Sequence, residues 1–129
     1  MTAPYQLYIA GPMRGIAEFN FPAFFGAERL LSEAGYRPFN PARYDVETLG
    51  FEYRGTTGHE DLDARGFDLA AALLVDLTYI CQEADGIALL PGWEWSKGAT
   101  AEVATARALG MPAEPLSYWT HNAHWFAAA

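Results

Sequence analysis

The strongest constraint on the fold is an alternation of short apolar runs with helical segments along the 129-residue chain. The apolar runs cover residues 5–10, 36–39 and 87–90, and each ends at Gly-Pro, Asn-Pro or Pro-Gly, as buried strands often do. Residues 21–34, about 60–84 and about 99–109 have helical patterns. Because strands that alternate with helices form parallel sheets with both faces covered, the sequence predicts an α/β fold.

A fourth strand is predicted over residues 112–118, where Pro112 and Pro115 weaken the pattern. No repeat, linker or low-complexity block divides the chain, and its length suits one domain. We therefore expect residues 1–129 to form one domain with a Rossmann- or flavodoxin-like three-layer fold. Its parallel sheet is expected to have four or five strands.

Two segments between the strands are unusual. Residues 40–58 are loop-like, with Pro41, Gly50, Gly55 and Gly58, and loops of that length are usually functional lids or binding loops. Residues 67–77 are apolar on more than one face of the predicted helix, so we expect this helix to be largely buried.

The charge balance limits the classes of partner. Sixteen acidic residues outnumber eight basic ones, which argues against binding of polymeric nucleic acid and favours one small phosphate site built from one or two arginines and backbone amides. No apolar run reaches the ~18 residues that a membrane span needs. The N-terminus lacks a secretory signal pattern and the chain has one cysteine, Cys81, so we expect a cytoplasmic protein without a membrane partner.

Ligands of parallel α/β folds bind beyond the C-terminal ends of the strands, which here means residues 11–20, 40–58 and 91–98. In the first of these, which ends at Asn20, Gly11 and Gly15 allow close approach of the backbone. Arg14 lies between these glycines and can form paired hydrogen bonds with a phosphate or carboxylate. An ordinary turn with an exposed arginine is the alternative.

The loop after the third strand has the features of a small anion site. Ser96 lies where a helix begins, and a helix N-terminus offers free N–H groups beside its hydroxyl. Simple capping of the helix by Ser96 is the alternative. Lys97, the only lysine, and Gly98 favour the anion site. Trp93 and Trp95 either stack on a flat ring or belong to the core.

Three further side chains are candidates for chemistry. Glu102 lies about one turn inside the last long helix among small or apolar neighbours, so its carboxylate would face the strand ends; a solvated glutamate is the alternative. Asp76 interrupts an apolar run, where a carboxylate is costly unless it is paired or functional. Tyr8 is placed to direct a phenol into the same cleft, or else to pack in the core. No His or Cys spacing indicates a zinc site.

Three motif blocks together resemble the nucleoside 2-deoxyribosyltransferase superfamily. They are Tyr8 to Gly15 (YIAGPMRG), Asp85 to Glu94 (DGIALLPGWE), and Ser96-Lys97-Gly98-Ala99 followed by Glu102. The resemblance runs from residue 5 to about residue 112. It is nearest to a small, often phage-borne branch with the pattern LPGW-E-x-S-x-GA-x-x-E, although Glu102-Val103-Ala104 stands where Glu-Leu-Gly is usual.

The resemblance implies a role for each matching residue. Glu102 corresponds to the nucleophile, Tyr8 to the group that orients it, and Asp76 to the residue that handles the leaving base. Arg14 and Ser96 resemble the phosphate contacts of the branch that hydrolyses 2′-deoxynucleoside 5′-monophosphates. The remaining substrate contacts are then expected from Gly11, Gly15, Asn20, Trp93, Lys97 and Gly98.

The expected function is therefore cleavage of the N-glycosidic bond of a nucleotide or nucleoside, with transfer of the sugar to water or to a second base. No metal or organic cofactor is expected. A non-catalytic nucleotide-binding or sensing module is the alternative. A structural role is a third, with Trp119, Trp125 and Phe126 docking a partner or a second copy. The resemblance also implies a homodimer or higher homo-oligomer.

Overall fold

In the computed structural model, which describes residues 4–127, the elements follow the expected alternation. The strands are β1 (Gln6–Ala10), β2 (Arg37–Phe39), β3 (Gly86–Leu89) and β4 (Ala113–Pro115). The α-helices are α1 (Phe21–Glu33), α2 (Pro41–Glu47), α3 (Leu69–Gln82), α4 (Lys97–Ala108), α5 (Leu116–His121) and α6 (Ala123–Phe126). Short 3-10 helices, η1 (Ala17–Asn20) and η2 (Trp93–Trp95), precede α1 and α4.

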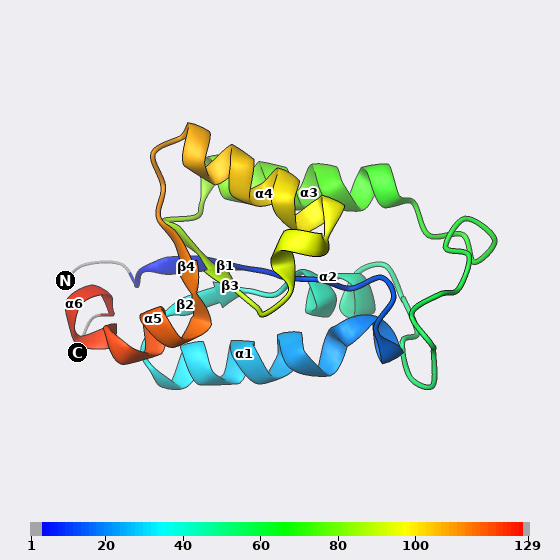
Figure 1. The fold of residues 1–129 in the computed structure, drawn as a ribbon, viewed down its shortest axis with the longest axis horizontal. Coiled ribbons are helices and arrows are strands. Elements are labelled where there is room, and N and C mark those ends of the chain that lie inside the picture. Colours follow the sequence, from blue (N-terminus) through cyan, green and yellow to red (C-terminus); the bar gives the residue numbers. More distant parts are fainter. Residues whose placement is uncertain (1–3, 128–129) are drawn as a thin grey trace.

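The strands form one four-stranded sheet in the order β2-β1-β3-β4, and every neighbouring pair is parallel. Helices α3 and α4 cover one face, and α1 and α5 cover the other (Figure 1). The predicted α/β fold with a Rossmann- or flavodoxin-like three-layer arrangement is thus confirmed.

Alternation along β1 divides its side chains between the two faces. Leu7 and Ile9 pack with α1, whereas Tyr8 and Ala10 pack with α3 and α4. This is the period of two expected for a strand buried on both faces. The phenol of Tyr8 is therefore directed to the same side of the sheet as α4, which carries Glu102.

The prediction of one loop over residues 40–58 is wrong for its first part, which forms α2. Asn40 caps this helix, since its Oδ1 accepts a 2.9 Å hydrogen bond from the N–H of Ala42, and Pro41 occupies the first helical position. The helix predicted to begin near residue 60 begins at Leu69. Asp68 caps it by accepting a 3.0 Å bond from the N–H of Ala71.

Helix α3 is also less buried than its composition indicated. Ala72 and Ile80 are its buried residues, whereas Leu69 and Leu74 are 55% and 67% exposed. One side of α3 packs against the sheet and α4, and the opposite side faces outward. Among the helices of residues 4–127, none is long and apolar enough to cross a membrane.

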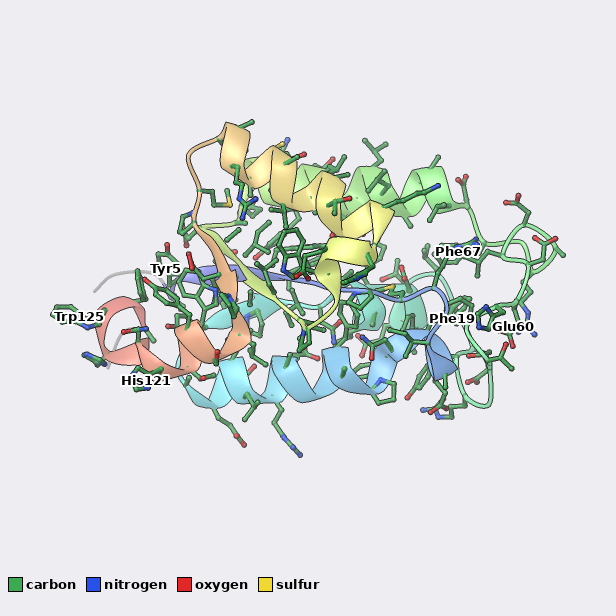
Figure 2. The ribbon with its side chains drawn as sticks, in the orientation of Figure 1. Tyr5, Phe19, Glu60, Phe67, His121 and Trp125 are labelled. Carbon is green, nitrogen blue, oxygen red and sulfur yellow. The ribbon has the colours of Figure 1, made fainter. Side chains whose placement is uncertain are left out.

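The tail aromatics belong mainly to the core, which corrects their predicted grouping as a docking surface. Trp119 is fully buried, and its Nε1 donates a 2.9 Å hydrogen bond to the carbonyl of Ile87. Phe126 packs on Trp119 and Tyr5 with ring centroids 5.0 and 5.3 Å apart. Only Trp125 of the three is exposed, and Figure 2 shows it pointing away from the body of the protein.

Candidate active site

A cavity of about 1080 Å³ lies at the C-terminal ends of β1, β2 and β3. Tyr8 and Glu102 line its inner part, and Arg14, Trp95 and Lys97 line it where side chains are exposed to solvent. Aromatic and aliphatic side chains form much of the remaining wall: Phe19, Phe21, Phe24, Phe51, Leu62 and Phe67. The cavity thus combines buried carboxylates, a cationic opening and an apolar wall.

The inner end of the cavity is organised by one buried hydrogen bond. The hydroxyl of Tyr8 donates to Oε2 of Glu102 over 2.7 Å. Tyr8 is fully buried and Glu102 is 6% exposed. Helix α4 follows β3 after residues 90–96, and Glu102, in its second turn, lies beside Tyr8 in the middle of β1.

Asp76, on α3, completes this group. Burial raises the pKa of Asp76 to about 7, although interactions with Tyr8 and Glu102 oppose the rise. Burial and then the charge of Asp76 raise the pKa of Glu102 to about 8, while the Tyr8 hydrogen bond acts in the opposite direction. The pKa of Tyr8 is raised well above its ordinary value, chiefly by burial and the Glu102 charge, so Tyr8 remains a hydrogen-bond donor.

Two interacting carboxyl groups with raised pKa values share their protons as a pair. Near neutral pH the Asp76–Glu102 pair can hold one proton, which gives one carboxylate and one carboxylic acid that line the same cavity. Because the pKa of Glu102 is the higher of the two, the proton lies mainly on Glu102, and the form with the proton on Asp76 is the minor one. Such an arrangement can supply a nucleophile and a proton donor at once.

The sequence reasoning missed Asp45, a third buried acid of the cavity. It lies on α2, is 7% exposed, and has a pKa raised to about 7 by burial and then by the charge of Asp76. The Asn40-Pro41 pair is an N-cap followed by proline at the first helical position, and it signals a helix start. If a helix starts at Pro41, Ala42 and Asp45 lie three residues apart on one face of that helix, just beyond the end of β2.

The cationic opening lies where the β1 and β3 loops meet. Arg14 and Lys97 are exposed and line the cavity with Ser96 and Gly98. Ser96 Oγ accepts a 3.1 Å bond from the N–H of Ala99, so the serine caps α4. Its hydroxyl proton and the first N–H groups of α4 remain suited to an anion at this helix N-terminus.

Gly11 lines the cavity and has a steric role. A Cβ there would lie 2.7 Å from the Cβ of Leu90, which is closer than real contacts allow. The absence of a Cβ at Gly11 lets the ends of β1 and β3 lie side by side. There the N–H of Leu90 donates a 2.8 Å hydrogen bond to the carbonyl of Ala10.

Three other residues predicted to bind substrate lie outside the cavity lining. Asn20 donates a 2.9 Å hydrogen bond to the carbonyl of Pro12, and Gly15 donates a 2.9 Å bond to the carbonyl of Gly58, so both hold the β1 loop in place. The ring of Trp93 packs on the α4 side of the core, with the guanidinium of Arg107 5.7 Å from its centroid. Trp95 lines the cavity instead.

Residues 48–68 close the apolar side of the cavity and are bonded to the β1 loop. Residues Glu18, Phe19 and Asn20 adopt left-handed φ angles of 57°, 53° and 62°. This conformation is rare for residues other than glycine. The N–H of Glu18 donates to the carbonyl of Thr56 over 2.9 Å, and the N–H of Gly55 donates to the Glu18 carboxylate over 3.0 Å. Figure 2 shows Phe19, Glu60 and Phe67 gathered at this end of the molecule.

Comparison with known proteins identifies the family. The family model described as a domain of unknown function, DUF4406, matches residues 5–114. Since this match covers most of the chain, the protein belongs to the DUF4406 family. No curated protein matches the chain. The family has no assigned function, so the resemblance to nucleoside 2-deoxyribosyltransferases stays a prediction.

Proposed function

We propose that this member of the DUF4406 family cleaves the N-glycosidic bond of a 2′-deoxynucleoside 5′-monophosphate and releases the free base. The observation that carries the proposal is the buried Glu102 carboxylate, held by Tyr8 over 2.7 Å and lining a cavity that opens beside Arg14 and Lys97. The motif blocks shared with nucleoside 2-deoxyribosyltransferases support the same reaction.

The chemistry requires two carboxyl groups in different protonation states. The proposed reaction uses the minor form of the pair, in which Asp76 holds the shared proton and Glu102 is ionised. The Glu102 carboxylate bonds to C1′ of the sugar as the C1′–N bond to the base breaks, and Asp76 gives its proton to the departing base nitrogen. Water then attacks C1′, returns a proton to Asp76 and frees Glu102. Covalent trapping divides one difficult step into two and stabilises the positive charge that develops on the sugar.

Tyr8 has a positioning role in this proposal. Its hydroxyl occupies one lone pair of Oε2 and leaves Oε1 of Glu102 to attack C1′. The bond also favours the ionised form of Glu102, against the burial and the Asp76 charge that raise its pKa. Because Tyr8 and Glu102 come from β1 and α4, the geometry rests on the core of the fold and not on a loop.

A 5′-phosphate is the group that best suits the cavity opening. Arg14 can form paired hydrogen bonds with phosphate oxygens, and Lys97 adds a second positive charge. Ser96 and the α4 N-terminus add N–H and O–H donors. The nucleoside-transferring enzymes of the resembling superfamily often have an aspartate at the position of Ser96, which holds a free 5′-hydroxyl, so a serine favours the phosphate.

Liquid chromatography of free base tests the proposal. The purified protein is incubated with the common nucleosides and nucleoside 5′-monophosphates, each with and without an added second base. We expect base release from at least one 2′-deoxynucleoside 5′-monophosphate, faster than from the matching nucleoside. A new nucleotide formed with the second base would identify a transferase. Tight nucleotide binding without base release from any compound would refute the proposal and favour a binding or sensing module.

A further inference from the structure

Asp45 is a buried acid that the proposed reaction does not use. It is 93% buried, and its side chain lines the cavity. Among residues 4–127, no side chain or backbone N–H donates a hydrogen bond to its carboxylate, and the charged group that acts on it most is another acid, Asp76. Because no fully buried side-chain oxygen of residues 4–127 lacks a hydrogen-bond partner, the Asp45 oxygens reach the open space of the cavity. A molecule bound there can supply the donors that the protein does not.

Helix α2, which carries Asp45, is held in place by hydrogen bonds to α1, and a fixed carboxylate suits the recognition of one ligand group. Asn40 caps α2 and also donates a 3.1 Å bond to the Glu28 carboxylate of α1. Arg43 bonds both oxygens of Glu28 over 2.8 and 2.9 Å and reaches Glu47 over 2.8 Å. The helix that carries Asp45 is thereby joined to Glu28 of α1 through Asn40 and Arg43.

The strand order places Asp45 at the end of the cavity opposite the cationic opening. The opening lies on the β1 and β3 loops, Tyr8 and Glu102 lie at β1, and Asp45 follows β2, which is the next strand in the order β2-β1-β3. A nucleotide with its phosphate at Arg14 and its C1′ at Glu102 therefore directs its base toward α2. The wall there is apolar and aromatic, with Phe51, Leu62 and Phe67, as a flat base requires.

We propose that Asp45 reads the base of the substrate and selects bases that carry an exocyclic amino group. This inference rests on the proposed function, since it takes the bound molecule to be a nucleotide. An ionised carboxylate accepts hydrogen bonds and cannot donate them. It accepts the N–H of an amino group on cytosine, adenine or guanine, and on guanine it accepts the adjacent ring N–H as well. It repels the carbonyl oxygen that replaces the amino group in uracil.

The test compares substrate pairs in which an oxo group replaces the amino group, dCMP with dUMP and dAMP with dIMP, at pH 8, where Asp45 is mainly ionised. In the pair that is turned over, we expect the wild-type protein to favour the amino member at least about tenfold in kcat/KM. Asp45→Asn, whose amide both donates and accepts, should reduce this ratio to about twofold or less. Asp63→Asn, which removes an exposed aspartate, is the matched control and should keep the wild-type ratio.

Binding of the same pairs to Glu102→Gln and to the Glu102→Gln/Asp45→Asn double variant, measured by calorimetry, separates this inference from the proposed function. Base release with an unchanged amino-to-oxo ratio in Asp45→Asn would overturn the role of Asp45 and leave the reaction standing. A wild-type preference for the oxo member would overturn it too. Selective binding that depends on Asp45, without any base release by the wild-type protein, would support the recognition role and refute the proposed reaction.

Discussion

The phenol of Tyr8 donates a 2.7 Å hydrogen bond to Oε2 of Glu102 and so joins β1 to α4 across 94 residues of sequence. Both groups are buried, and Asp76 interacts with both. The bond fixes the direction of the Glu102 carboxylate and favours its charged form in a site where burial favours the neutral one. Several measurable consequences depend on this contact.

Removal of the Tyr8 hydroxyl should slow the reaction without abolishing substrate binding. In Tyr8→Phe we expect kcat to fall by about 10²–10³-fold with little change in KM, since one preorganised donor is lost at the reacting group. Loss of the hydrogen bond that lowers the pKa of Glu102 should also move the acid limb of kcat/KM to higher pH. Tyr79→Phe, which removes a phenol from the same face of the sheet outside the cavity, should leave both quantities near wild type.

The pH dependence of kcat/KM should be bell-shaped with its maximum between about pH 7 and 8, where the Asp76–Glu102 pair holds one proton. Below this range protonation removes the nucleophile, and above it ionisation removes the acid. Asp76→Asn should lower the rate by about 10²–10⁴-fold and abolish the alkaline limb. Because the charge of Asp76 raises the pKa of Glu102, this variant should also move the acid limb to lower pH. An unchanged alkaline limb would exclude Asp76 as the proton donor.

Arg14 should matter for phosphorylated substrates and not for the corresponding nucleosides. In Arg14→Ala we expect KM for the 5′-monophosphate to rise by about tenfold or more, which corresponds to the loss of a hydrogen bond between charged groups. Steady-state kinetics on a nucleotide and its nucleoside measure the difference. Arg29→Ala, an exposed arginine on α1, is the control for net charge. Equal effects of Arg14→Ala on both substrates would contradict the phosphate role.

Asp45 should destabilise the folded protein at alkaline pH. Burial and the charge of Asp76 raise its pKa to about 7, against about 3.9 in an unfolded chain, so the folded state binds more protons than the unfolded state between these values. Asp45 therefore does not lower the free energy of unfolding below about pH 4, and it lowers it progressively as the pH rises through about 7. Asp45→Asn should raise the free energy of unfolding by up to about 4 kcal/mol at pH 8 and by less than half as much at pH 5. Urea unfolding at the two pH values measures this, and a gain that is equal at both would argue against a buried, titrating Asp45.

The sequence pattern was sufficient to predict strand ends and helix starts where the local signals agree with the global fold. The Gly-Pro and Pro-Gly pairs ended β1 and β3 close to where the structure ends them, and Ser96 caps α4, which was the alternative to an anion site. Once α4 is fixed relative to β3 and β1, the meeting of Glu102 with Tyr8 follows from the parallel topology.

Other features depended on packing that no local pattern determines. Asn40-Pro41 ends a strand and also starts a helix, so reading it only as a stop hid α2 and with it Asp45. The η2 turn, and not the spacing of the two tryptophans, turns Trp93 toward the core and leaves Trp95 at the cavity. The exposure of Leu69 and Leu74 depends on which neighbours cover α3, and the apolar composition of a helix does not determine this.

The rate of free-base release by Glu102→Gln, measured beside the wild-type protein on its best 2′-deoxynucleoside 5′-monophosphate, tests the central claim most directly. Glutamine keeps the shape and the hydrogen-bond acceptor for Tyr8 but removes the nucleophilic carboxylate. We expect release to fall by at least about 10³-fold, with thermal unfolding near wild type and with Glu33→Gln, an exposed glutamate on α1, fully active. Turnover by Glu102→Gln within about tenfold of wild type would contradict the assignment of Glu102 as the nucleophile.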